Sequence, residues 1–352
     1  MRGRRTATGT LGKVLLAALL VSLSLAGCSP DAAERKERAE GHLAEGRTTR
    51  SIMLDVIVGL TPVLVATVWL YRLQAIQLTA TTVGACLFTE AAANRLRGRG
   101  RGSLTDGSAV VTGMILAFSL PPLLPTYMAF LGGVVAIGLG KMAFGGLGQN
   151  LFNPAMVGRA FLMACFPVAM TTWAHPFDLQ PLGVDAVSGA TPLAAAKFGT
   201  GAVPGLWPLL VGDVGGSIGE TSAFAILLGG AFLLLRRAAD WRQPLGVLSG
   251  AGAFAAAAHA LAPDRFVGLP IHLASGALMF GAFFIATDPV GCPLTPRGRL
   301  FFGLGVGVLV MVIRLFGGYP EGVMFAVLLM NALTPLIERW TRPEPFGGRS
   351  EP

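Results

Sequence analysis

Charged side chains are scarce in this sequence. Only 13% of its 352 residues are Asp, Glu, Lys or Arg, whereas about 25% is usual in soluble domains. Hydrophobic residues make up 53% of the chain, and several apolar runs approach the roughly 20 residues that cross a bilayer as a helix. This composition excludes an ordinary soluble domain and predicts an all-α polytopic protein of the lipid bilayer.

Cysteine and histidine are rare as well, with four residues of each. The cysteines (Cys28, Cys86, Cys165 and Cys292) lie far apart and form no CxxC pair. The histidines are not spaced as metal ligands. We therefore predict no zinc or iron–sulfur site built by this chain alone, and no other metal site.

The net charge of +8 is concentrated in short connections between apolar runs. Examples are "RLRGRGRG" at 95–102, "RRAADWR" at 236–242 and "RGR" at 297–299. Arginine between spans is the usual signal for loops that stay in the cytoplasm. The basic residues therefore indicate membrane orientation, and we expect no nucleic-acid partner.

The hydrophobic pattern predicts about ten membrane segments. The third is short and stops at "SLPP" (119–122), which favours an interrupted helix. The expected segments are 52–72, 75–95, 107–121, 124–143, 155–173, 221–236, 244–261, 269–287, 299–314 and 319–337.

The arginine bias sets the predicted orientation. If residue 50 is cytoplasmic, the arginine-rich connections at 95–106, 237–243 and 288–298 are cytoplasmic too. The longest connection, 174–220, then lies outside the cytoplasm. The expected organisation is an N-terminal extension (1–50), a first transmembrane repeat (51–173), the outer loop (174–220), a second repeat (221–340) and a cytoplasmic tail (341–352).

Weak internal echoes favour two repeats of five segments each. "VTGMILAFSLPP" (111–122) is similar to "ASGALMFGAFFIATDP" (274–289), and "KMAFGG" (141–146) is similar to "IRLFGG" (313–318). "FNPAMVGRAFLMACFP" (152–167) is similar to "YPEGVMFAVLLMNALTP" (319–335). An odd number of segments inverts the second copy, and inverted repeats with interrupted helices are typical of membrane transport proteins.

The first fifty residues are atypical. A basic start, an apolar core from Val14 to Ala26 and "LAGC" (25–28) are typical of a secretory signal with a lipidated Cys28. Cleavage there would invert the orientation that the later arginines favour. We interpret 1–50 as an atypical extension, a mis-assigned start or an extra hydrophobic segment, with lipidation at Cys28 as the alternative.

The outer loop contains "DAVSGAT" at 185–191, which small residues leave open to another enzyme's active site. The Thr191 hydroxyl could accept a phosphate ester, although Ser, Gly, Ala and Thr are also ordinary turn residues. The stretch resembles a flavinylation motif, in which a transferase attaches FMN through its phosphate to a threonine outside the cytoplasm.

Five further stretches agree with this resemblance. "RSIMLDVIVGLTP" (50–62), "NLFNPAMVGRAFL" (150–162), "GSIGETSAFAILLGG" (216–230), "ATDPVGCPLTPRGRLFFG" (286–303) and "GGYPEGVMFAVLLMNALTPLIERW" (317–340) occur in the order expected. They resemble the D subunit of the Rnf ion-translocating oxidoreductase complex and the homologous B subunit of the sodium-translocating NADH:quinone reductase. The shorter N-terminal arm favours the Rnf subunit.

The resemblance implies covalent FMN at Thr191, with recognition by the transferase through Asp185, Ser188, Gly189 and Ala190. It implies a subunit of a redox-driven ion translocase of the bacterial inner membrane, which couples ferredoxin and NAD chemistry to sodium or proton transport. Partners would be the other Rnf subunits, including a second flavin-bearing one, and the flavin transferase. No catalytic acid or base is expected. The family can also hold riboflavin, to which the sequence assigns no residues.

Charged residues near or within membrane segments are candidates for ion coupling because their burial in lipid is costly. Structural interpretations stand beside them: Asp288 can open a turn before Pro289, and Glu220 can complete a capping box with Ser217. The alternative function is a transporter or channel without redox chemistry, which has no need for the Thr191 loop. The candidates are Asp55, Glu90, Arg159, Glu220, Asp288 and Glu321.

Overall fold

A computed structural model shows an all-helical architecture for the residues it describes, which are 48–98, 101–176, 189, 191–199, 204–263 and 266–342. The N-terminal signal-like segment, Cys28 and the tail after 342 lie outside them. The α-helices are α3 (Thr49–Leu96), α4 (Ser108–Phe118), α5 (Thr126–Ile137), α6 (Pro154–Cys165), α7 (Pro167–Met170), α8 (Pro192–Phe198), α9 (Leu206–Val211), α10 (Ala223–Leu235), α11 (Arg242–Leu261), α12 (Leu269–Ala274), α13 (Leu278–Phe280), α14 (Pro296–Phe316) and α15 (Val323–Thr341). Shorter helical pieces are η1 (Arg101–Thr105), η2 (Gly138–Met142) and η3 (Gly281–Ile285).

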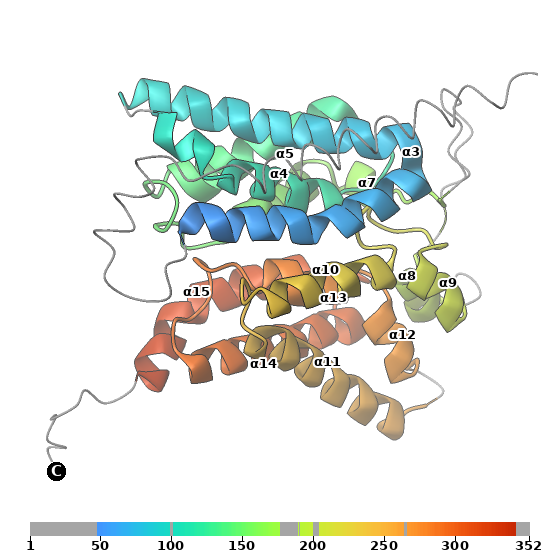
Figure 1. The fold of residues 1–352 in the computed structure, drawn as a ribbon. Helices are drawn as coiled ribbons and strands as arrows, with labels where there is room; N and C mark the ends of the chain where they lie inside the picture. Colours follow the sequence, from blue (N-terminus) through green and yellow to red (C-terminus); the bar gives the residue numbers. More distant parts are fainter. Residues whose placement is uncertain are drawn as a thin grey trace, which may run out of the picture.

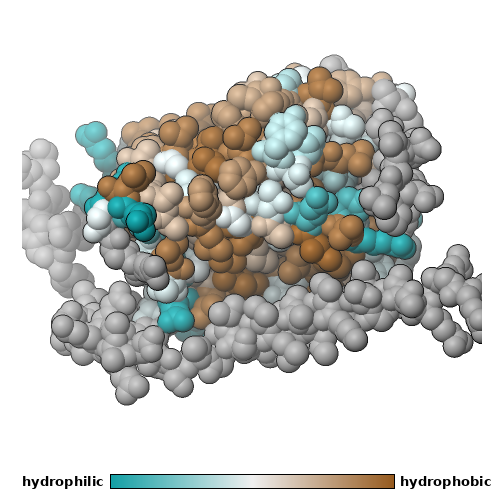
Figure 2. Space-filling view, turned by 90° about the horizontal axis from the view of Figure 1, so that it is seen from above, coloured by the Kyte–Doolittle hydropathy of each residue, from teal (hydrophilic) through white to brown (hydrophobic). Residues whose placement is uncertain are grey.

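Every predicted membrane segment contains helix, and two short helices, α8 and α9, lie in the predicted outer loop. Four helices, α3, α11, α14 and α15, are long and apolar enough to cross a bilayer, and the surface in Figure 2 is hydrophobic over most of its middle. Helix α3 covers the first two predicted segments and is sharply kinked at Arg72, which has φ 51° and ψ −121°. The chain is therefore a membrane protein of several helical segments.

Two halves of the chain pack side by side (Figure 1). Helices α3 to α6 form the blue-to-green half, and α10 to α15 form the yellow-to-red half. The short helices α8, α9 and α12 gather at one end of the molecule, called here the α8 end. The start of α3 and the end of α15 lie at the opposite end.

Each half contains an interrupted helix, as predicted. Helix α4 starts after Gly107, which has φ +82°, and ends before the "SLPP" stretch. Backbone N–H groups of Ile218 and Gly219 donate to the carbonyls of Leu120 and Phe118, so another segment satisfies the broken end. In the second half α13 starts after Gly276, with φ +64°. The two breaks meet where the Phe118 and Phe280 rings pack edge to face.

Glycines bring the backbones of α11 and α14 together. A Cβ at Gly307 would lie 2.2 Å from the Val247 carbonyl oxygen, and one at Gly250 would lie 2.7 Å from that of Leu304. Gly246 and Gly250 of α11 face Gly303 and Gly307 of α14, so each helix presents small residues four apart. Such close approach is how helices associate in lipid, where no hydrophobic force drives their contact.

Candidate functional site

Thr191 is the N-cap of α8. Its Oγ1 accepts a hydrogen bond from the Ala194 backbone N–H at 3.2 Å, and Pro192 occupies the first helical position. Gly199 ends the helix in the left-handed conformation, with φ +66°. Threonine before proline and glycine after the last turn are ordinary signals for the two ends of a helix. This helix was missed by the sequence analysis, which predicted only a loop here.

The Thr191 side chain is buried, with only 2% of its surface exposed. The sequence predicts instead a loop open to another enzyme. The difference arises because α8 is docked onto the second half, with Leu193 and Ala195 buried beside Thr191. Of the four predicted recognition residues, Gly189 is described, and its N–H donates to the Trp173 carbonyl at 3.0 Å. Asp185, Ser188 and Ala190 lie outside the described residues.

Thr191 lines a cavity of about 250 Å³ at the α8 end. Aromatic side chains form much of its wall, and Gly189 lies beside Thr191 with open space where a Cβ would be. Two charged residues, Arg159 and Glu321, also reach the cavity. The aromatic residues are Trp173, Phe198, Tyr319 and Phe325.

An ionic cluster connects three segments at this cavity. Arg159 Nη1 lies 3.0 Å from Glu220 Oε1, and Arg159 Nη2 lies 3.3 Å from Glu321 Oε2. Arg159 and Glu220 are almost fully buried, and the Glu321 side chain is 12% exposed. Two carboxylates around one guanidinium leave a formal charge of −1 if all three groups are ionised. The structure thus brings together three of the six charged residues that the sequence analysis selected.

A second buried cluster lies in the first half, away from Thr191. Lys141 Nζ of η2 lies 2.7 Å from Glu90 Oε1 and 2.6 Å from Ser108 Oγ at the start of α4. Ser103 Oγ donates to the same carboxylate oxygen at 2.8 Å. Glu90 Oε2 has no hydrogen-bond partner among the described residues. Lys141 was missed as a functional candidate, although a lysine inside a predicted membrane segment is itself a signal.

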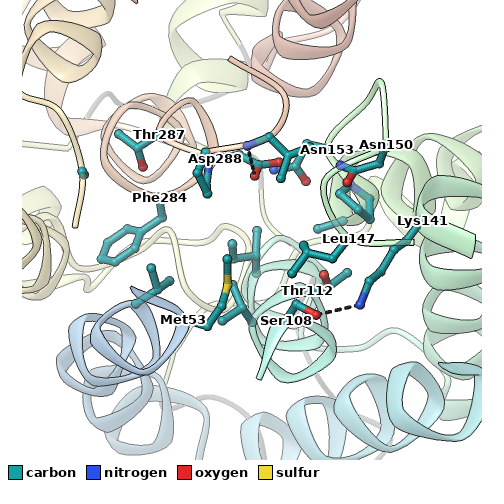
Figure 3. A pocket seen from close by; sticks show the side chains of 18 of the residues that line it. Met53, Ser108, Thr112, Lys141, Leu147, Asn150, Asn153, Phe284, Thr287 and Asp288 are labelled. Carbon is teal, nitrogen blue, oxygen red and sulfur yellow. Dashed lines mark hydrogen bonds between the residues drawn. The ribbon is translucent and has the colours of Figure 1, made fainter. Parts of the chain in front are cut away.

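A narrow cavity of about 60 Å³ lies between the halves, beside Lys141 (Figure 3). Its wall is mostly apolar, and Met53 and Leu147 are among the side chains that line it in Figure 3. Asn150 and Asn153 line one side, and Asp288 lies nearby. The buried Asn150 Oδ1 has no hydrogen-bond partner among the described residues, so the cavity contains an unsatisfied acceptor.

The remaining charged candidates hold structural contacts. Asp55 Oδ1 accepts from Arg236 Nε at 3.2 Å and so connects α3 with the end of α10. Asp288 Oδ1 accepts from the Val290 N–H at 3.2 Å, which confirms the predicted turn before Pro289. The predicted capping box was wrong: Ser222, not Ser217, is the N-cap of α10, because its Oγ accepts from Ala225.

The comparisons with known proteins agree on one family. The model of the NQR2, RnfD, RnfE family matches residues 37–347. The chain is 44% identical over 324 residues to the D subunit of the ion-translocating oxidoreductase complex of Stutzerimonas stutzeri, covering 84% of this chain and 91% of that protein.

Two further relatives carry more specific names. One is the D subunit of the proton-translocating ferredoxin:NAD(+) oxidoreductase complex of Clostridium ljungdahlii, with 41% identity over 88% of this chain and 95% of that protein. The other is the D subunit of the Na(+)-translocating ferredoxin:NAD(+) oxidoreductase complex of Acetobacterium woodii, with 42% identity over 87% and 93%. The match of the family model over residues 37–347 and the identity to these relatives show that the chain belongs to the NQR2, RnfD, RnfE family.

Proposed function

We propose that this chain is the D subunit of an Rnf-type complex and carries covalent FMN at Thr191. In this role it relays electrons beside a pathway that couples ferredoxin and NAD chemistry to sodium or proton transport. The observation that carries the proposal is the position of Thr191, whose hydroxyl lines an aromatic cavity next to Arg159. Relatives named as subunits of ion-translocating ferredoxin:NAD(+) oxidoreductases support it.

The residues around Thr191 fit an esterified flavin. When bound, FMN supplies one- and two-electron transfer, and the protein supplies position and electrostatics. The Thr191 oxygen can accept from Ala194 as an ester as well as a hydroxyl, so attachment need not uncap α8. Trp173, Phe198 and Tyr319 provide flat apolar surfaces for a ring system and exclude water. The Arg159 guanidinium is fixed by two carboxylates at the edge of the same cavity.

Burial of Thr191 constrains how FMN is attached. A flavin transferase must reach a hydroxyl that is 2% exposed while α8 is docked. We infer that transfer occurs while the 189–199 segment is undocked, and that docking of α8 then closes the cavity around the flavin. The small residues of "SGAT" leave this segment unhindered for recognition by a second enzyme.

The narrow cavity between the halves is the place we propose for non-covalent riboflavin. The buried Asn150 Oδ1 accepts no hydrogen bond from any described residue. The imide N–H of a flavin could donate one to it. The tricyclic flavin ring can enter only if Met53 and Leu147 move. Both side chains lie on the cavity wall and are not branched at Cβ, so they can change rotamer. Replacement of Asn150 by Ala should lower the extractable riboflavin and leave the covalent FMN in place.

For ion coupling we propose the two buried charge clusters, Lys141–Glu90 and Arg159–Glu220–Glu321. Both clusters contain carboxylates buried inside the helical bundle, where an uncompensated negative charge is costly. A sodium ion or proton that binds such a carboxylate compensates its charge. We propose that the α8 end lies on the periplasmic side of a bacterial inner membrane, which the arginine bias of the connections supports. The other subunits of the complex, one of them flavin-bearing, are the expected partners.

In-gel fluorescence of the denatured protein tests the proposal. The full chain, co-expressed with a flavin transferase, should give a fluorescent band that is absent without the transferase. Digestion and mass spectrometry should place the flavin on the peptide that contains Thr191. A Thr171→Ala variant, which changes another threonine of the same cavity, is the matched control and should keep the band. Absence of covalent flavin in every sample would favour a transporter or channel without redox chemistry.

A further inference from the structure

A separate cavity of about 230 Å³ lies between α8, α12 and α14, and its lining differs from that of the Thr191 cavity. Thr191 does not line it. Leu193, Ala196 and Lys197 of α8 form one wall, and the end of α14 forms another. Among the described residues that line it, the polar side chains are Lys197, His272 and Arg314, and none is a carboxylate.

His272 places a buried imidazole at this cavity. Only 4% of the residue is exposed, and neither ring nitrogen has a partner within the described part of the chain. Leaving a buried polar atom unsatisfied is costly, so such an atom facing a cavity points to a ligand or to ordered water. The imidazole offers at least one N–H donor to that cavity in either protonation state.

Arg314 adds a second buried donor and a positive charge. It is 2% exposed, and its two terminal nitrogens donate to the carbonyls of His272 (2.7 Å) and Ser275 (3.0 Å). Its Nε has no partner among the described residues, and it forms no ion pair with any of them. The nearby Glu321 pairs with Arg159 at 3.3 Å and lines the other cavity.

The comparison with Lys141 shows what Arg314 lacks. The similar sequences "KMAFGG" and "IRLFGG" each contain a buried cation, Lys141 at the first position of one and Arg314 at the second position of the other. Lys141 has a carboxylate at 2.7 Å, supplied by Glu90 of α3. Helix α11, the second helix of the other half, supplies no acidic residue. Arg314 thus has no carboxylate at ion-pair distance among the described residues: its hydrogen-bond partners are carbonyl oxygens, and Glu321 and Glu220 act on its charge from a greater distance.

Lys197 strengthens the positive character of this wall. Its Nζ donates to the carbonyls of Ile313, Gly317 and Tyr319, and it therefore joins α8 to the end of α14. Outside the polar centre, the exposed rings of Phe198 and Phe316 flank the cavity, with 55% and 63% of their surfaces exposed. A charged centre with an apolar rim suits a ligand that combines an anionic group with hydrocarbon.

We propose that this cavity binds a phosphate group, either as a free anion or as the headgroup of an anionic phospholipid. Buried donors of Arg314 and His272 would bind the phosphate oxygens, and the positive charges would balance the ligand. Arginine suits phosphate because its planar group presents several N–H donors at once. This cavity shares Phe198 and Pro320 with the Thr191 cavity, but Lys197, His272 and Arg314 line only this one.

Binding is tested with the full-length protein in a neutral detergent. Native mass spectrometry measures retention of phosphatidylglycerol against phosphatidylcholine, and thermal unfolding is recorded with inorganic phosphate against chloride at equal ionic strength. The variants are His272→Leu, Lys197→Gln and Arg314→Gln. The matched control is His175→Leu, whose side chain is 44% exposed and lies outside the cavity.

We expect phosphatidylglycerol to be retained more tightly than phosphatidylcholine, or phosphate to raise the melting temperature, or both. His272→Leu and Arg314→Gln should each lower the apparent affinity for the bound ligand at least tenfold. Stabilisation by phosphate without lipid selectivity identifies a free anion, and lipid selectivity alone identifies a headgroup. If Arg314→Gln does not fold, the binding measurements on His272→Leu and Lys197→Gln test the proposal instead. Equal retention of both lipids without a phosphate effect overturns the proposal, and so does unchanged binding in His272→Leu.

Discussion

Thr191 Oγ1 accepts a hydrogen bond from the Ala194 backbone N–H at 3.2 Å, so the proposed flavin acceptor is also the N-cap of α8. One atom thus serves the local fold and the proposed attachment chemistry. Substitutions that separate the two roles are available, because serine, asparagine and aspartate cap helices as well as threonine does.

Thr191→Asn should retain the cap and lose the covalent flavin, because an amide does not form the phosphate ester. Thr191→Ala should lose both and destabilise the protein by about 1 kcal/mol, the usual cost of a lost N-cap. Thermal unfolding and in-gel fluorescence measure the two effects on the same samples. Thr191→Ser is the positive control and should keep both. A fluorescent Thr191→Asn band would show that the flavin is attached elsewhere.

The membrane orientation is tested by cysteine accessibility. Phe198→Cys at the α8 end should react with a membrane-impermeant thiol reagent in intact cells, and Leu96→Cys should react only after lysis. These positions are 55% and 88% exposed in the chain. The reverse pattern would overturn the predicted orientation and favour the lipidated N-terminus.

The native cysteines set the background of this experiment. Exposed Cys165 needs replacement by serine, as does Cys28, which lies outside the described residues, whereas Cys86 is buried. Burial raises the pKa of the Cys292 thiol to about 11, so this thiol stays protonated and unreactive at neutral pH. Both buried cysteines can therefore remain.

Hydropathy was sufficient to predict where the main helices lie. Each predicted segment contains helix in the structure, and "SLPP" ends α4 as expected. The segments are predictable because bilayer thickness fixes their length, and proline removes a backbone donor. The bounds differ by a few residues, as for α15, which starts at Val323 rather than 319.

Short helices and distant pairings were harder to predict. Helix α8 has seven residues, too few for a hydrophobic period, although Thr191, Pro192 and Gly199 are signals for its ends. The partners of Arg159 lie 61 and 162 positions away along the chain. Sequence composition marks such a charge as unusual, but only the packing of the halves determines which carboxylate meets it.

Packing of α11 on α14 should depend on glycine. Gly307→Ala places a methyl group 2.2 Å from the Val247 carbonyl oxygen, and the two helices must separate to accept it. We expect a loss of about 1–3 kcal/mol in stability, the usual cost of overpacking. Gly252→Ala on α11 is the control, because its nearest contact is an ordinary 3.6 Å. It should be neutral or slightly stabilising, and equal melting temperatures for both variants would contradict the prediction.

The buried Lys141–Glu90 pair should show strong coupling in a double-mutant cycle. Lys141→Met leaves Glu90 without its cation in a site where neither side chain is more than 1% exposed. Removal of one partner of a buried pair costs about 3–5 kcal/mol, whereas removal of both leaves no charge to compensate. Lys141→Met combined with Glu90→Gln should therefore unfold at a higher temperature than Lys141→Met alone.

The Asp55–Arg236 pair is the control: the Arg236 side chain is 59% exposed, and its coupling should stay below about 1 kcal/mol. An equally small coupling energy for Lys141 and Glu90 would show that Lys141 does not stabilise the Glu90 carboxylate. The proposed role of this cluster in ion coupling would then be wrong.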